Sequence, residues 1–168
     1  MSEVVPLFKS HYSLGRSILT LEKAGETLDN HPDSIIDIVK DNKLKKFFLI
    51  DDNMSGFLQG YSNAKEAGLD FVFGLRISIC SDMFQKDEES KSETCKYIIL
   101  VKSLEGYKRL VKIYTKASKE GFYYYPRIDF KNLNKLWNED DLELAIPFYD
   151  SFIFNNVMGS ALCIPDFN

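Results

Sequence analysis

Residues 45–75, KKFFLIDDNMSGFLQGYSNAKEAGLDFVFGL, decide the fold of this chain. The apolar run at 47–50 stops at two aspartates, a pattern typical of a strand buried on both faces of a parallel sheet. Residues 56–67 then suit a helix, and Gly68 suits the residue that ends it. A second apolar run follows at 69–75. The segment therefore predicts a strand–helix–strand unit with a right-handed crossover.

The same alternation of strands and helices is expected on both sides of this unit. Upstream, residues 4–8 predict a buried strand, and residues 30–33 predict the start of a helix. Downstream, the polar stretch 82–94 shows no periodicity and predicts a surface excursion. Further strands are expected at 97–101 and 142–148, and a short helix at 133–137. The chain is therefore expected to have an α/β fold.

Another helix is expected to follow Ser103, which suits an N-terminal cap. Its predicted apolar face consists of Leu104, Tyr107, Leu110, Val111 and Tyr114. Folds of this class place their chemistry in the loops that follow strand ends. The expected strand-end positions are 9–16, 51–54, Arg76, Lys102 and 149–150.

The composition is that of an ordinary globular protein of one domain. The chain has 168 residues, and its net charge of −4 argues against strong autonomous binding to DNA. Its three cysteines are far apart and form neither a zinc-binding nor a disulfide pattern. No signal peptide is recognisable, and no apolar run approaches the roughly 20 residues that cross a bilayer. A cytoplasmic location without membrane association is therefore expected.

Three segments resemble the PHP domain of the bacterial DNA polymerase III α subunit. VPLFKSHYSL (5–14) is similar to the first motif, a strand that ends in His-x-His followed by Ser-x-Tyr-Ser. FLIDDNMSGFLQGYSNAKEAGLDFVFGLRI (48–77) resembles the second and third motifs, which end in Asp-His and Gly-x-Glu. YIILVKSLEGYKRLVKIYTKASKEGFYYYPRID (97–129) resembles a family strand, its Gly-Tyr-x-x-Leu helix and its Phe-Tyr-Tyr-x-Pro-Arg-Ile segment.

This resemblance implies a fold more specific than the α/β class. Residues 1–130 are similar to the family, and residues 131–168 diverge from it. The expected architecture is a distorted (β/α)7 barrel of mostly parallel strands, incomplete or truncated, in a single domain over 1–168.

The resemblance also implies where metal ions would bind, and there the sequence departs from the family. The family's chemistry depends on three metal ions held by His, Asp, Glu and Cys at strand ends. Here the corresponding vestigial site is Leu7, Lys9, His11, Arg16, Asp51, Asp52, Arg76, Lys96 and Tyr149. Four of these residues are cations, which repel a metal ion. No metal, cofactor or catalytic residue is therefore expected.

Two questions about these residues stay open. Lys9, Arg76 and Lys96 either pair with Asp51 and Asp52 in place of the metal charge or extend into solvent. The aromatic run is a candidate interaction surface that could stack on single-stranded nucleic acid, or it could pack around the barrel rim. The residues of this surface are Tyr123, Tyr124, Tyr125 and Arg127.

The function implied by the resemblance is that of a non-catalytic PHP-like module, a structural or interaction domain in DNA replication. The alternative is a metal-dependent phosphoesterase or 3′–5′ exonuclease, which the replaced ligands disfavour. An incomplete barrel would leave an edge strand and apolar surface uncovered. The expected partner is therefore the polymerase core, another replication protein or a second copy of the chain. The sequence leaves open whether the chain is a stand-alone protein or part of a longer one.

Overall fold

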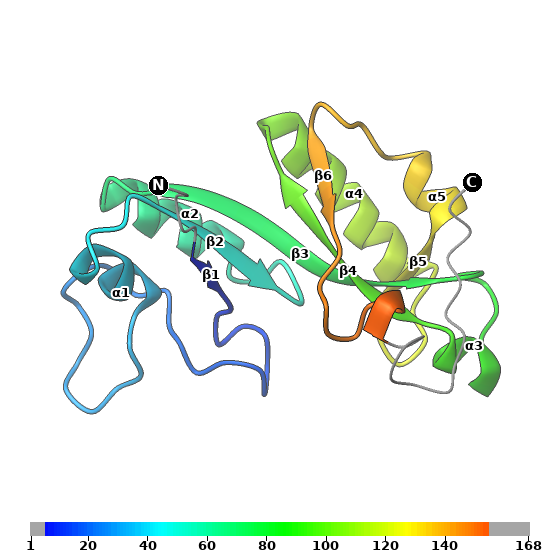
Figure 1. Cartoon of the computed structure of the whole chain (residues 1–168), viewed down its shortest axis with the longest axis horizontal. Helices are drawn as coiled ribbons and strands as arrows, with labels where there is room; N and C mark the ends of the chain where they lie inside the picture. The colour runs from blue at the N-terminus through cyan, green and yellow to red at the C-terminus, as the bar shows by residue number, and fades with distance from the viewer. Residues whose placement is uncertain (1–5, 155–168) are drawn as a thin grey trace. The chain divides into compact units, whose positions relative to one another are not determined.

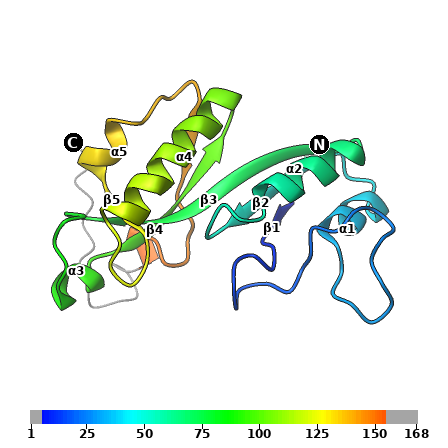
Figure 2. The ribbon, with the colours of Figure 1, turned by 180° about the vertical axis from the view of Figure 1, so that it is seen from behind.

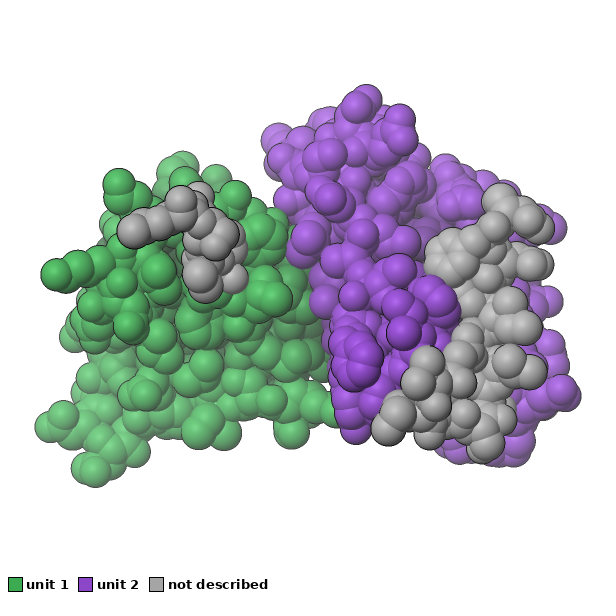
Figure 3. Space-filling view, in the orientation of Figure 1, with its two compact units in different colours: residues 1–75 green, residues 76–168 purple. Residues whose placement is uncertain are grey.

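The computed structural model of the chain describes residues 6–154, which form an α/β fold with a mixed, open sheet of six strands (Figure 1). The strands follow one another across the sheet in the order β1-β2-β3-β4-β6, and β5 pairs with β3. The chain divides into two compact units, residues 1–75 and 76–168, which Figure 3 shows in different colours. Each unit is described by itself below.

The first unit contains the predicted strand–helix–strand segment. Its elements are β1 (Leu7–Phe8), α1 (Ile35–Asp41), β2 (Lys46–Asp51), α2 (Phe57–Glu66) and the first part of β3 (Asp70–Cys80). Both β1 and β3 pair with β2 in parallel. Gly68 ends the α2 segment with φ +70°, the left-handed conformation expected there. The predicted strand–helix–strand order with parallel strands is therefore confirmed for residues 45–75.

The strand expected at 4–8 is only partly present. β1 covers two residues, and Leu7 exposes 67% of its surface, so the prediction of a buried strand is wrong at this residue. The physical reason is that β1 lies at the end of the strand order, where β2 is its neighbour in the sheet. Residues 4 and 5 lie outside the described part.

Aromatic rings and α1 fill the core of the first unit. Phe57 of α2 meets Phe73 edge to face, with ring centroids 4.2 Å apart, and also contacts Phe71. Such pairs contribute roughly 0.5–1.5 kcal/mol beyond the burial of their area. Ser34 caps α1 through its hydroxyl and orients the helix so that its apolar face is buried. The buried residues of α1 are Ile35, Ile36 and Val39.

The second unit holds the remaining elements. They are α3 (Glu88–Ser92), β4 (Cys95–Val101), α4 (Leu104–Lys119), β5 (Arg127–Asp129), α5 (Phe130–Asn134) and β6 (Leu142–Ala145), together with the end of β3. β5 pairs with β3 in parallel, whereas β6 is antiparallel to β4. An antiparallel strand interrupts the succession of parallel strands that closes a (β/α) barrel. The expected barrel is therefore an open, mixed sheet over the described residues.

Helix α4 lies across β4 and β6, as Figures 1 and 2 show from opposite sides. The Ser103 hydroxyl accepts a hydrogen bond from the Gly106 amide at 3.0 Å, which confirms the predicted cap. A Cβ atom at Gly106 would collide with the backbone carbonyl of Asp141, so the helix approaches the chain before β6 very closely. The buried stripe is consequently Gly106, Leu110, Ile113 and Ala117.

This stripe corrects the predicted apolar face of the helix. The prediction is right at Leu110 and wrong at Leu104 and Val111, which are exposed. The contact at Gly106 explains the difference, because a glycine carries no hydrophobic signal although it begins the buried stripe.

Several element boundaries also differ from the predictions. β3 continues five residues beyond residue 75, and β5 was not expected. Helix α5 begins earlier than residue 133 because the Asp129 carboxylate accepts a hydrogen bond from the Asn132 amide at 2.7 Å. β6 ends at Ala145, short of residue 148. Within residues 6–154 no helix is long and apolar enough to cross a membrane.

Candidate functional site

In the first unit, the ends of β1 and β2 bring the predicted aspartates close to the first cation. Lys9 follows β1 directly, and Asp51 and Asp52 lie at the end of β2. Parallel neighbouring strands end at the same edge of a sheet, which is why these residues meet. Lys9 Nζ lies 2.8 Å from Asp52 Oδ2, so of the two alternatives left open for Lys9 the structure shows pairing, with Asp52.

The Asp51 carboxylate is fully buried and accepts hydrogen bonds from two serines. Ser10 donates through its backbone amide to Oδ1 at 2.8 Å and through its hydroxyl to Oδ2 at 2.6 Å. The Ser13 hydroxyl donates to Oδ1 at 2.9 Å and accepts from the Asp52 amide at 2.9 Å. Both serines lie in the Ser-x-Tyr-Ser stretch, yet sequence reasoning gave them no role. We call these five residues (Lys9, Ser10, Ser13, Asp51 and Asp52) the serine–aspartate cluster.

The other predicted residues of the first unit have different surroundings. Leu7 is exposed on β1, and Arg16 is an exposed loop residue. His11 Nδ1 lies 3.2 Å from the Leu19 carbonyl oxygen, and its ring contacts that of Tyr12 at 4.3 Å between centroids. The histidine therefore helps to fold its own loop.

In the second unit, Asp150 connects two of the predicted cations. Arg76 Nη2 donates to Asp150 Oδ2 at 2.7 Å, and the Lys96 amide donates to the Asp150 carbonyl at 2.7 Å. The Lys96 ammonium donates to the Ser78 hydroxyl at 2.5 Å and lies 5.0 Å from the ring centroid of Tyr125. Asp150 was placed at a strand end by the sequence but was given no role.

The other predicted ion pairs would join residues of different units. Arg76 and Lys96 belong to the second unit and Asp51 and Asp52 to the first, so their expected pairing stays a prediction. Tyr149, the last residue of the predicted vestigial site, is exposed, and its ring centroid lies 4.7 Å from that of Phe154.

The metal ions implied by the resemblance do not fit the residues present. Within residues 6–154 no group of three or more His, Cys, Asp or Glu residues is arranged to hold a metal ion. The Asp51 carboxylate already accepts from three donors, and the ammonium of Lys9 lies against Asp52. A positive charge at this distance opposes the binding of a divalent cation. The donor set is therefore that of a hydrogen-bonded ion pair.

The candidate aromatic surface is only partly exposed. Tyr124 is exposed and adopts a left-handed backbone conformation with φ 60°, whereas Tyr123 and Tyr125 are half-buried. The Tyr125 hydroxyl lies 2.8 Å from the Thr94 hydroxyl. Arg127 is fully buried, so it does not belong to an exposed surface, contrary to the sequence-based grouping.

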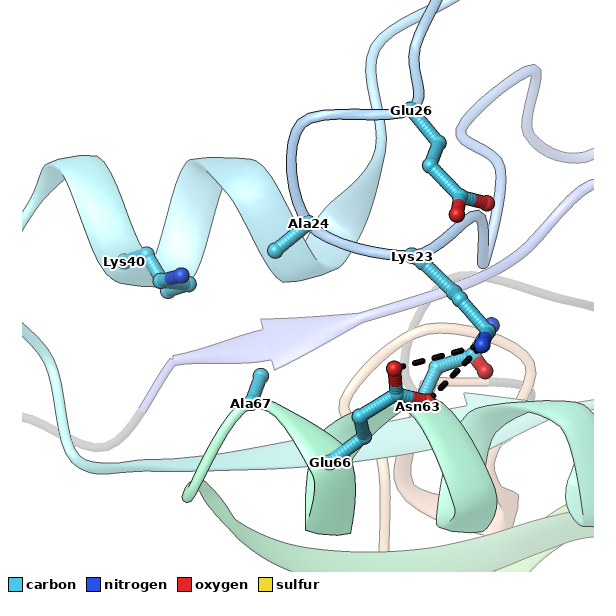
Figure 4. Close-up of a pocket in the computed structure, with 7 residues that line it drawn as sticks. All are labelled: Lys23, Ala24, Glu26, Lys40, Asn63, Glu66 and Ala67. Carbon is cyan, nitrogen blue, oxygen red and sulfur yellow. Dashed lines mark hydrogen bonds and ion pairs between the residues drawn. The ribbon is translucent and has the colours of Figure 1, made fainter.

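A pocket of about 210 Å³ lies in the first unit, between residues 23–26, α1 and the end of α2 (Figure 4). Lys23 and Lys40 line it together with Glu26 and Glu66, so its charges balance. Lys23 Nζ lies 2.9 Å from Glu66 Oε2, and the hydrogen bond to Glu66 raises the pKa of Lys23. None of the predicted site residues lines this pocket.

Comparison with known proteins identifies a family for the chain. The family model described as PHP domain matches residues 9–151. The chain is 35% identical over 79 residues to the DNA polymerase III subunit alpha of Chlamydia muridarum, which covers 46% of this chain and 6% of that protein. It is 34% identical over 85 residues to the subunit of Borreliella burgdorferi, with coverages of 49% and 7%.

A third relative gives the same result. The subunit alpha of Aquifex aeolicus is 36% identical over 90 residues, which are 49% of this chain and 8% of that protein. The matches thus span a small part of each relative's length. The family model covers most of the chain, and we conclude that this protein belongs to the PHP domain family and is related to the DNA polymerase III alpha subunit.

Proposed function

We propose that this chain is a non-catalytic PHP module that serves as a structural or interaction domain in DNA replication. The relatives' name supports the link to replication, because each is a DNA polymerase III subunit alpha. The serine–aspartate cluster supports the absence of catalysis and is the observation that carries the proposal.

The chemical argument rests on what metal-dependent phosphoester hydrolysis requires. Metal ions polarise the phosphoryl oxygen and lower the pKa of a bound water so that hydroxide forms at neutral pH. In this chain the Asp51 oxygens accept from two serines, and Asp52 accepts from Lys9. These contacts supply positive charge and hydrogen-bond donors where the family would place metal ions. The cluster thus joins two strand ends instead of binding a substrate.

The proposed partner is the polymerase core or another replication protein. The matched region covers only 6–8% of the relatives, so in those proteins it is one module beside many other parts. β6 stands at the end of the strand order, and Ile146 and Phe148 beyond it are exposed. An edge strand with apolar residues beside it favours association with another protein surface.

Metal analysis and enzyme assays test the absence of catalysis. Purified protein that was never exposed to a chelator should contain no stoichiometric zinc or manganese by ICP-MS. It should hydrolyse neither phosphomonoesters nor DNA 3′ ends with Mn²⁺ or Zn²⁺ added. Stoichiometric metal, with turnover that Asp51→Ala or Asp52→Ala abolishes, would instead establish the metal-dependent phosphoesterase or exonuclease.

Light scattering after size exclusion tests the proposed partner. The chain is mixed with a purified DNA polymerase III α subunit, and a co-eluting complex is expected. Phe148→Ser should weaken this complex, whereas Leu58→Ser, at an exposed residue of the first unit, is the matched control. A dimer of the chain alone would point to self-association, and a monomer in both experiments would contradict the proposed role.

A further inference from the structure

Arg127 at the start of β5 is a fully buried cation. Its Nη2 donates to the Gln85 carbonyl at 2.7 Å, and its Nε donates to the Gly121 carbonyl at 3.3 Å. Its Nη1 donates to the carbonyl and hydroxyl oxygens of Ser90, at 3.1 and 3.3 Å. The ring centroid of Tyr123 lies 5.2 Å from the guanidinium carbon. Within residues 6–154 no carboxylate pairs with this guanidinium.

This arrangement is unusual, because a buried arginine is normally neutralised by an acid. Here backbone and hydroxyl oxygens, together with the Tyr123 ring, stabilise the charge in place of a carboxylate. The carbonyls come from two segments that are far from each other in sequence, 82–94 and the turn that begins at residue 121. The guanidinium can therefore be desolvated only if both segments fold around it.

Arg127 contacts the polar segment 82–94, which the sequence predicted to be a surface excursion without regular structure. The structure corrects this, because Met83 and Ser90 are buried and α3 forms within it. Asp87 and Ser90 form a capping box, in which the hydrogen bond from the Ser90 amide lowers the pKa of Asp87. The Met83 amide donates to Asp129 Oδ2 at 3.2 Å, which fixes the segment next to β5.

The turn at residue 121 is held equally closely. A Cβ atom at Gly121 would collide with the backbone carbonyl of Arg127 and would lie 3.0 Å from the Met83 side chain. The turn, β5 and the start of the 82–94 segment thus meet at one point. Phe84 and Phe122, which are the sequence neighbours of Met83 and Gly121, are both exposed.

We propose that Arg127 is a buried clamp that folds residues 82–94 against the turn 121–126 and thereby sets the positions of the exposed rings of Phe84, Phe122 and Tyr124. The planar guanidinium offers five donors in a fixed geometry, which suits carbonyls that approach from several directions. A lysine ammonium at the same position cannot reach both segments at once. The capping box and the Met83–Asp129 hydrogen bond also hold the segment, and Arg127 adds the hydrogen bonds that connect Gln85 and Ser90 to Gly121.

Hydrogen–deuterium exchange of the full chain tests the clamp. In Arg127→Met and Arg127→Lys, amides of residues 85–94 and 121–125 should exchange about tenfold faster or more, as expected for the loss of charge-assisted hydrogen bonds. Amides of β2 and α2 should keep their protection. Arg109→Lys is the matched control, because Arg109 contacts Asp141 and the Leu136 carbonyl elsewhere in the same unit. It should leave residues 85–94 unchanged.

A second variant keeps the test informative if the Arg127 variants do not fold. Ser90→Ala removes one acceptor of the guanidinium and one half of the capping box, while Arg127 stays in place. Faster exchange confined to residues 82–94 and 121–126 is the expected result. Unchanged protection of these residues in Arg127→Met, or changes spread evenly over the unit in Ser90→Ala, would overturn the proposal.

Discussion

The Ser10 hydroxyl lies 2.6 Å from Asp51 Oδ2, and the amide of the same residue donates to Asp51 Oδ1 at 2.8 Å. This two-point contact fixes the first residues after β1 against the end of β2. Since Ser13 adds a third donor, the loop is held in place by hydrogen bonds to one carboxylate. The stability of the first unit should therefore depend on Asp51 and not on divalent metal.

Asp51→Ala should lower the free energy of unfolding by about 3 kcal/mol, because it leaves buried donors without an acceptor. Asp51→Asn keeps one acceptor oxygen and should cost less. Urea unfolding of both variants measures the effect, with Asp29→Ala at an exposed position as the control. Removal of divalent ions with EDTA should not shift the wild-type midpoint. An Asp51→Ala midpoint equal to that of wild type would show that the cluster does not stabilise the unit.

Lys9→Met should destabilise the chain by about 1 kcal/mol, because the ion pair with Asp52 is only 24% and 27% exposed at its two side chains. A double-mutant cycle with Asp52→Asn isolates the coupling between the two residues. Lys23→Met, which breaks the more exposed pair with Glu66, is the matched control and should change the midpoint little. A midpoint shift for Lys9→Met no larger than that for Lys23→Met would contradict the prediction.

Arg76→Ala should destabilise the fold more than Lys86→Ala. The Arg76 side chain is only 12% exposed and donates to Asp150 at 2.7 Å, so its removal leaves a carboxylate without this partner. Lys86 is exposed, and its truncation should change the free energy of unfolding by no more than about 0.5 kcal/mol. Equal urea midpoints for Arg76→Ala and Lys86→Ala would show that Arg76 contributes no more to stability than a solvated surface residue.

Asp141 should make stability depend on pH in the acid range. The hydrogen bond from the Ser103 hydroxyl, followed by that from Arg109, lowers the pKa of Asp141 below its ordinary 3.8. A lowered folded-state pKa gives stability that is present above the unfolded-state value and is lost as the pH falls through the folded-state value. The midpoint difference between wild type and Asp141→Asn should therefore shrink below pH 3.8.

Ser103→Ala provides the second arm of this experiment. It removes the largest cause of the pKa shift, so its unfolding free energy should depend less on pH than that of wild type. Parallel profiles for wild type and Asp141→Asn over the whole acid range would show that the carboxylate does not contribute in this way.

The central strand–helix–strand segment could be predicted because its signals are local. The apolar run before Asp51 and the glycine at residue 68 fix the elements without reference to the rest of the chain. β5 has three residues, two of them charged, and carries no such signal. The orientation of β6 is set by the connection that precedes it, so an apolar run at 142–148 could not show that it pairs antiparallel with β4.

Contacts between charged residues at neighbouring strand ends could be predicted from the sequence. Contacts in which a serine hydroxyl or a backbone carbonyl is the partner of a charged group could not. Lys9 and Asp52 follow neighbouring parallel strands, so their contact could be expected. Ser10 and Ser13 look like ordinary loop residues until the buried carboxylate next to them is seen. The burial of Arg127 depends on a carbonyl 42 positions away, for which no sequence pattern exists.

Gly106 and Gly121 both lie in the block 97–129, where the resemblance to PHP domains is most specific, and a methyl group fits at neither position. At both positions a backbone carbonyl occupies the space that a side chain would need. This packing requirement does not depend on any chemistry at the strand ends. The end of β1 is more permissive, since Leu7 and Lys9 occupy the positions at which the resemblance would place the two histidines of the first motif. The two glycines thus conserve the packing of the fold at these points, whatever the residues at the strand ends do.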